Sequence, residues 1–211
     1  MDINKYIIEG VNLVAVSKKH SVDKIKEAVN SGVKIIAENR IQEAEEKYAE
    51  LKDFFKEKNV EFHFIGNLQR NKAKKAVMMF DLIQCIDSYS IAAEIDKRAK
   101  TIDKVQRVLV QVNIGKEKKK KGLKPKDVLD IVSKLSTLEN IKLEGLMCIT
   151  PNIEPEDRRI YFKRMKQLYD KSNNICQMKY LSMGMTIDYK IAIEEGSNMI
   201  RLGTAIFGER T

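Results

Sequence analysis

The chain has 211 residues, of which 43% are hydrophobic and 33% charged, and its formal net charge is +9. This balance is typical of a globular protein rather than a disordered one, and no apolar run reaches the roughly 18–20 residues that a membrane span needs. The first residues lack the apolar core of a signal peptide. The three cysteines have neither disulfide nor metal-ligand spacing. We therefore expect a cytoplasmic protein with reduced thiols.

Short β-branched runs alternate along the chain with longer helical stretches. The runs with strand length and composition are 13–16, 34–37, 62–65, 82–86, 108–112, 143–149, 180–183 and 199–202. The helical stretches are 22–30, 41–58, 71–80, 91–101, 126–138, 156–173 and 188–195, with a short last helix at 204–207. Ser21 is expected to cap the first of these helices and Gly32 to end it.

Eight strand–helix units in succession predict a parallel sheet with right-handed crossovers. Eight such units in about 200 residues suit a compact TIM-type barrel. We therefore expect a single (β/α)8 barrel domain over residues 1–211, with an N-terminal helix around Ile3, Tyr6 and Ile7 covering its bottom. The alternative is a doubly wound open sheet, which is less favoured because residues 17–20 read Ser-Lys-Lys-His and not a glycine-rich phosphate loop.

The active site of such a barrel lies at the carboxyl ends of its strands. Lys18 directly follows the first strand, and partial burial there would favour a neutral, nucleophilic amine of the kind that a carbonyl cofactor needs. The alternative is an ordinary strand-end lysine that reaches into water.

The ends of the last two strands suggest an anion site across the same rim. Ser182, Gly184 and Thr186 supply hydroxyls and close backbone approach, while Gly203 and Thr204 open a helix whose N–H groups point at an anion. Turn chemistry and helix capping are the alternative explanation. A phosphate cradle on this rim would favour the cofactor interpretation of the lysine.

Two further features have a structural explanation. His63 lies within a strand on the same face as Ile65 and is expected to be a satisfied core or supporting histidine rather than a catalytic base. The basic runs at Lys116–Lys121 and Arg70–Lys75 are interpreted as a solvated loop and helix face. The alternative is a nucleic-acid or partner-binding surface.

Several blocks resemble the pyridoxal 5′-phosphate (PLP) homeostasis proteins, which are similar to the barrel domain of bacterial alanine racemase. The blocks are 13–18, 38–39, 63–72, 111–114, 145–147, 181–188 and 196–208. Two departures stand out: Lys118–Lys121 precedes Gly122 where the family usually has Ser-Lys-x-Gly, and Thr186 replaces a serine.

The resemblance implies specific roles around PLP. Lys18 would hold PLP as a Schiff base, and Ser182, Gly203 and Thr204 would bind its phosphate. Arg201 would lie near the pyridine nitrogen and Asn39 near the cofactor ring. Met183 is expected to pack against the cofactor, with core packing as its alternative.

These roles lead us to expect a PLP carrier in vitamin B6 homeostasis without robust catalysis. An arginine beside the ring nitrogen disfavours a protonated ring and so weakens carbanion stabilisation. A racemase also needs a second acid/base, which in the alanine racemases is a tyrosine from a further domain. The alternatives are a small amino-acid racemase and a nucleic-acid module. We expect a monomer, apo forms of PLP-dependent enzymes as recipients, and neither membrane nor specific nucleic-acid binding.

Overall fold

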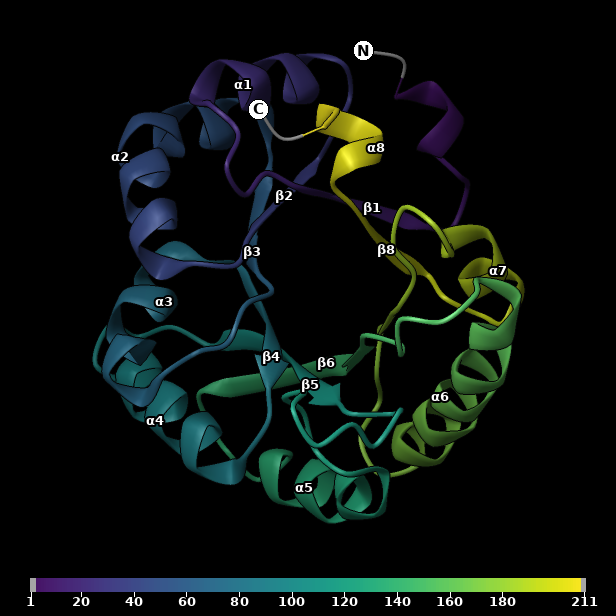
Figure 1. The fold of residues 1–211 in the computed structure, drawn as a ribbon. Helices are drawn as coiled ribbons and strands as arrows, with labels where there is room; N and C mark the ends of the chain where they lie inside the picture. Colours follow the sequence, from purple (N-terminus) through teal and green to yellow (C-terminus); the bar gives the residue numbers. More distant parts are fainter. Residues whose placement is uncertain (1–2, 210–211) are drawn as a thin grey trace.

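Eight parallel strands close into a barrel in the order of the chain, and the helices form a ring around it (Figure 1). The computed structural model describes residues 3–209. The strands are β1 Asn12–Val16, β2 Ile35–Glu38, β3 Glu61–Phe64, β4 Leu82–Ile86, β5 Gln106–Val112, β6 Ile141–Cys148, β7 Tyr180–Ser182 and β8 Met199–Leu202. Because β1 pairs with β8, the expected TIM-type barrel is confirmed and the open-sheet alternative is wrong.

The helices follow the strands in regular alternation. They are α1 Val22–Asn30, α2 Ile41–Lys58, α3 Ala73–Met79, α4 Tyr89–Lys100, α5 Val128–Leu135, α6 Arg159–Asn173, α7 Tyr189–Glu194 and α8 Thr204–Phe207. Single 3-10 turns at Arg70–Lys72, Pro125–Asp127 and Glu156–Arg158 lead into α3, α5 and α6. Ser21 caps α1 as expected, since its hydroxyl accepts from the N–H of Lys24 at 3.4 Å.

The expected N-terminal helix is a single 3-10 turn, η1, at Asn4–Tyr6. Ile3 is buried, and the ring of Tyr6 meets the ring of Tyr189 on α7 edge-on at 5.8 Å. Ile7, in contrast, is 54% exposed. This turn therefore packs against α7 at the periphery instead of forming a helix across the barrel bottom (Figure 1).

The two faces of the strands build two separate cores, because successive side chains of a strand point to opposite sides. The inner core of the barrel contains Val14, Ile35, Ala37, Leu82, Leu109, Met147, Tyr180 and Met199. A larger outer core lies between the strands and the helices. Among the described residues, no helix is long and apolar enough to cross a membrane.

The same alternation decides which side chains reach the mouth of the barrel. On β1, Val14 faces the interior, so Lys18, four residues later, continues that face beyond the strand end. The pairing of Val16 with Ala37 places Lys18 beside Asn39. The pairing of Ala15 with Leu202 places it beside the residues that follow β8.

Candidate functional site

A cavity of about 480 Å³ opens at the carboxyl ends of the strands. It is lined by Val16, Lys18, Asn39, Arg40, Ile65, Gly66, Asn67, Ile149, Met185, Thr186, Ile187, Arg201, Gly203 and Thr204. Its walls thus combine aliphatic side chains with one lysine amine, one buried arginine and two hydroxyls. A smaller cavity of about 240 Å³ shares Ile65, Gly66, Asn67 and Ile149 with it and extends toward Lys120 and Lys121.

Five of the seven predicted site residues line this cavity. Lys18, Asn39, Arg201, Gly203 and Thr204 come from the ends of β1, β2 and β8 and are brought together by closure of the barrel. The sequence separates the first and last of these by most of its length, so the grouping depends on the fold.

Ser182 and Met183 lie elsewhere. Ser182 is fully buried and faces the barrel interior, where its hydroxyl contacts Arg201 and Gln84. Met183 is fully buried in the outer core, because alternation along the chain turns it to the opposite side from Ser182. The structure therefore does not bring the Met183 side chain to the cavity, and its packing in the core is the alternative that applies.

A buried network outside the barrel fixes the backbone on both sides of Lys18. The Ser17 hydroxyl donates to the Glu38 carboxylate at 2.6 Å, and Lys47 Nζ donates to both the Ser17 carbonyl at 2.7 Å and Glu38 at 2.6 Å. The Lys19 N–H donates to the Glu43 carboxylate, with Lys19 at a φ of 64°. Burial raises the pKa of Glu38 despite its contact with Lys47. These contacts orient the chain so that the intervening Lys18 reaches into the cavity.

Arg201 presents a buried guanidinium from β8 and is only 4% exposed. Its Nη1 donates to the Ser182 hydroxyl at 2.6 Å, and its Nη2 donates to the Cys148 carbonyl at 2.8 Å. Burial lowers its pKa, yet a guanidinium remains charged in proteins and can only donate hydrogen bonds. The site therefore offers a fixed positive donor at this wall.

Two threonine hydroxyls meet at the rim of the cavity. Thr204 Oγ1 donates to Thr186 Oγ1 at 3.4 Å at the start of α8, where the first N–H groups have no intrahelical acceptor. Asp188 holds the loop that carries Thr186, since its carboxylate accepts from the Met185 N–H at 2.6 Å and from buried Arg158 at 2.9 Å. Such a pairing of hydroxyls with a helix start suits a phosphate.

Thr186 lines the cavity, although the roles that the resemblance implies do not include it. Its signal in the sequence is a hydroxyl two residues after Gly184, which already placed it in the predicted anion site. What the sequence does not give is which hydroxyl, Ser182 or Thr186, reaches the rim.

The basic loop after β5 borders the site instead of being wholly solvated. Lys120 Nζ donates to the Thr150 carbonyl at 2.9 Å and pairs with Glu117 at 2.6 Å. Asn113 organises this loop, because its side chain donates to the carbonyls of Glu117 and Lys120 and accepts from the N–H of Glu117. The loop thus forms one wall of the smaller cavity.

Together these groups fit a ligand of defined chemistry. A lysine amine can react with a carbonyl, the Thr186–Thr204 rim can hold a phosphate, and Arg201 can donate to a ring nitrogen. Aliphatic side chains such as Ile65 and Ile149 can flank a planar ring.

Comparisons with known proteins agree with this chemistry. Residues 2–211 match the family model described as alanine racemase, N-terminal domain. A pyridoxal phosphate homeostasis protein of Aquifex aeolicus (strain VF5) is 42% identical over 202 residues, which cover 94% of this chain and 86% of the relative. The structure of PipY from Synechococcus elongatus PCC7942, with PLP bound, has a TM-score of 0.89 at 33% identity and covers 98% of this chain and 96% of its own.

A more distant structure shows the fold alone. The alanine racemase of Clostridium difficile 630 has a TM-score of 0.74 at 18% identity, and the match covers 98% of this chain but 54% of the racemase. From the family model and the homeostasis relatives, the resemblance inferred from the sequence is confirmed. The chain belongs to the pyridoxal phosphate homeostasis protein family, whose barrel is that of the alanine racemase N-terminal domain.

Proposed function

We propose that this protein binds PLP through Lys18 and acts in PLP homeostasis without robust catalysis. The observation that carries the proposal is the convergence of Lys18, Arg201 and the Thr186–Thr204 pair on one 480 Å³ cavity. The structure of PipY with PLP bound, which is 33% identical to this chain, supports PLP as the ligand.

Each residue has a role that follows from its place. The Lys18 amine would hold PLP through a reversible carbon–nitrogen double bond to the aldehyde carbon, with the aldehyde oxygen leaving as water. Thr186, Thr204 and the N–H groups at the start of α8 would hold the phosphate. Arg201 would donate a hydrogen bond to the pyridine nitrogen, and Asn39 would lie near the ring. When bound, PLP supplies an electron-withdrawing ring whose strength depends on protonation of that nitrogen.

Two features of the site support a carrier over a racemase. Arg201 would keep its charge next to the ring nitrogen and so would disfavour protonation there. Racemisation also needs a second acid/base on the opposite face of the substrate. Among the described residues that line the cavity there is no carboxylate, histidine, cysteine or tyrosine to act as this second acid/base.

The first experiment is a visible absorption spectrum of the PLP-treated protein before and after borohydride, with peptide mapping of the reduced product. We expect a visible band that borohydride removes, with the label on Lys18. Lys18→Ala should abolish it. Lys19→Ala is the matched control, because it removes a neighbouring, exposed lysine. A band that survives Lys18→Ala, or a label on another lysine, would contradict the proposed site.

Racemisation of alanine or serine by the purified protein, abolished by Lys18→Ala, would instead favour the alternative function, a small amino-acid racemase.

We also propose that the protein is a cytoplasmic monomer whose barrel holds PLP until an apo-enzyme takes it up. Transfer of PLP to an apo-enzyme faster than release into buffer would support that role, and equal rates would contradict direct transfer.

A further inference from the structure

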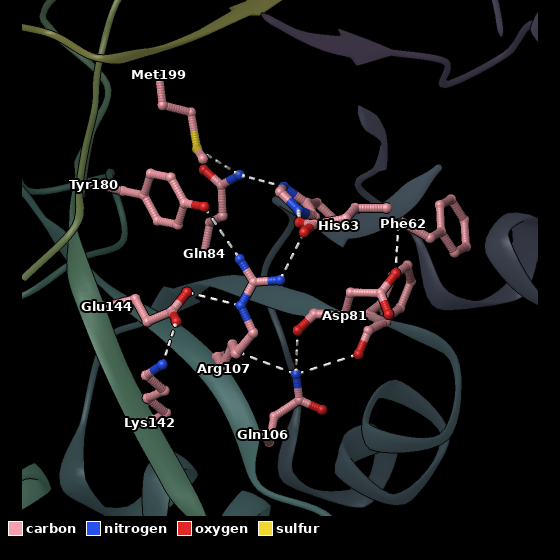
Figure 2. A network of polar contacts seen from close by, with 12 residues as sticks. Phe62, His63, Asp81, Gln84, Gln106, Arg107, Lys142, Glu144, Tyr180 and Met199 are labelled. Carbon is pink, nitrogen blue, oxygen red and sulfur yellow. Dashed lines mark hydrogen bonds and ion pairs between the residues drawn. The ribbon is translucent and has the colours of Figure 1, made fainter. Parts of the chain in front are cut away.

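A continuous chain of hydrogen bonds crosses the barrel interior from the cavity to the opposite end. Arg201 Nη1 lies 2.6 Å from Ser182 Oγ, which lies 2.8 Å from Gln84 Oε1. Gln84 Nε2 lies 3.1 Å from His63 Nδ1, and His63 Nε2 lies 2.8 Å from Glu61 Oε2. Figure 2 shows the contacts of the Gln84 amide group with His63 and with Met199.

The interior members of the chain are inaccessible to solvent. His63, Gln84 and Ser182 are all 0% exposed. The described residues that line the cavity include Arg201 but none of these three. Their effect on a ligand must therefore pass through Arg201.

Glu61 sets the direction of donation at the far end. Its pKa is lowered to about 2, chiefly by the hydrogen bond from His63 and also by Arg107, so it is an ionised acceptor at neutral pH. Arg107 lies between two carboxylates, donating to Glu61 at 2.9 Å and to Glu144 at 2.7 Å (Figure 2). His63 must therefore carry its proton on Nε2.

The remaining donors follow one after another. With the proton on Nε2, neutral His63 can only accept at Nδ1, so the Gln84 amide group donates to it. The Gln84 carbonyl then faces Ser182 and accepts a hydrogen bond from its hydroxyl. Ser182 Oγ is left to accept from Arg201, which can only donate. Each bond in the series thus has one compatible direction.

We propose that His63, Gln84 and Ser182 are positioning residues that hold the Arg201 guanidinium at the cavity wall, and that they do so only while His63 is uncharged. The affinity part of this inference rests on the proposed PLP function. The hydrogen-bond chain itself can be tested without PLP.

A charged His63 would reverse the bond at its Nδ1. An imidazolium donates from both nitrogens, so Gln84 would have to turn its carbonyl toward His63 and its amide group toward Ser182. Ser182 Oγ would then face two donors, and its own proton would lose its acceptor. Protonation of His63 would therefore weaken the hydrogen bond from Arg201 to Ser182, although His63 does not itself contact Arg201.

The groups that act on His63 favour its neutral form. Burial is the largest influence and lowers its pKa, and Arg107 acts in the same direction. Glu61 and Asp81 oppose this effect. We therefore expect the series of hydrogen bonds from Arg201 to Glu61 to be intact at neutral pH and to be broken only in acid.

The first test reads the His63 tautomer by nitrogen NMR in the apo-protein. The sequence has two histidines, so His20→Phe, which retains a ring against Phe207, leaves His63 as the single imidazole. We expect the Nε2–H tautomer at pH 7. An Nδ1–H tautomer or a charged ring at that pH would overturn the proposal.

The second test measures the PLP dissociation constant of Gln84→Leu and Ser182→Ala. Loss of one link should weaken PLP binding about tenfold and should shift the Arg201 Nε–H resonance in the apo-protein. Gln106→Leu is the matched control, because Gln106 is equally buried but bonds to the carbonyls of Phe80, Asp81 and Arg107 outside the chain.

The outcomes separate the two proposals. Weakened PLP binding in Gln84→Leu and Ser182→Ala but not in Gln106→Leu supports positioning of Arg201. Unchanged affinity in both, or equal weakening in Gln106→Leu, overturns it. If Gln84→Leu fails to fold, the PLP affinity of Ser182→Ala and the His63 tautomer still test the positioning of Arg201. If the native protein binds no PLP, the proposed function is wrong. The His63 tautomer and the Arg201 Nε–H resonance of the apo-protein still test the series of hydrogen bonds.

Discussion

Thr186 carries the hydroxyl that lies 3.4 Å from Thr204 at the rim of the cavity. The side chain of Thr186 is held there by its loop, in which Asp188 accepts from the Met185 N–H. This contrasts with Ser182, whose hydroxyl is already engaged by Gln84 and Arg201. At the scale of single residues, we therefore propose that Thr186 makes the phosphate contact on this loop.

Replacing Thr186 with valine keeps the shape of the side chain and removes the hydroxyl. Loss of one hydrogen bond to a charged phosphate should weaken PLP binding about tenfold, equivalent to about 1.4 kcal/mol. Binding of pyridoxal, which lacks the phosphate, should change little. Absorbance titrations with both compounds measure this difference, and Thr137→Val, on an exposed position, is the control. Equal losses for PLP and pyridoxal would contradict the phosphate assignment.

At the scale of elements, the turn between β7 and α7 depends on a glycine. Gly184 has a φ of +95°, and a Cβ added there would lie 2.7 Å from the Cβ of Ala192 on α7. The turn therefore requires both a left-handed backbone and the absence of a side chain. Its geometry delivers the following residues to the cavity rim.

Gly184→Ala should be more destabilising than Gly10→Ala, which makes the same chemical change at another positive φ. Gly10 has a φ of +74° with nothing within 4 Å of an added Cβ, so we expect only backbone strain there, about 1–2 kcal/mol. Gly184→Ala adds overpacking of about 1–3 kcal/mol. Urea unfolding of the two variants measures the difference. Equal losses of stability would mean that α7 moves aside without cost.

The elements themselves were largely predictable, because parallel barrel strands are buried on both faces and are therefore written as apolar runs. The 3-10 turn at Pro125–Asp127 was not separated from its helix, and that helix ends at Leu135 instead of residue 138. Propensity resolves neither feature, since helix ends depend on local packing.

The candidate site was predictable where strand ends decide the position. Lys18, Asn39 and Arg201 follow from the rule that barrel sites lie at the carboxyl ends of strands. The role of Met183 was not, because β7 ends at Ser182 and alternation then turns Met183 outward. Whether a hydroxyl lies at the rim or one layer below depends on strand tilt and loop path, which no single motif records.

At the scale of the whole molecule, the two ends of the barrel have different tasks. The carboxyl ends of the strands carry the cavity, while charged groups close the other end of the interior, where Arg107 pairs with Glu61 and Glu144 (Figure 2). His63 joins this charged layer to the interior. Removing one of these charges should therefore lower the stability of the fold and also disturb the position of Arg201.

Acid should destabilise the fold in two stages that can be assigned. The pKa of His63 is lowered from its ordinary 6.5 by burial, so the unfolded chain binds the extra proton first and stability falls as the pH drops below about 6.5. The pKa of Glu61 is lowered from 4.5 to about 2. Its contribution is therefore complete above 4.5 and is lost as the pH falls from there toward 2.

Urea unfolding over a series of pH values tests this order. Glu61→Gln removes the titrating carboxylate but keeps an acceptor for His63, so the loss of stability between pH 4.5 and 2 should become shallower than in the native protein. Glu50→Gln, at an exposed position on α2, is the control and should leave the slope unchanged. Equal slopes in Glu61→Gln and the native protein would show that the charge of Glu61 does not stabilise the base of the barrel. That result would also remove the basis for the direction of the hydrogen bonds from Arg201 to Glu61, which depends on an ionised Glu61.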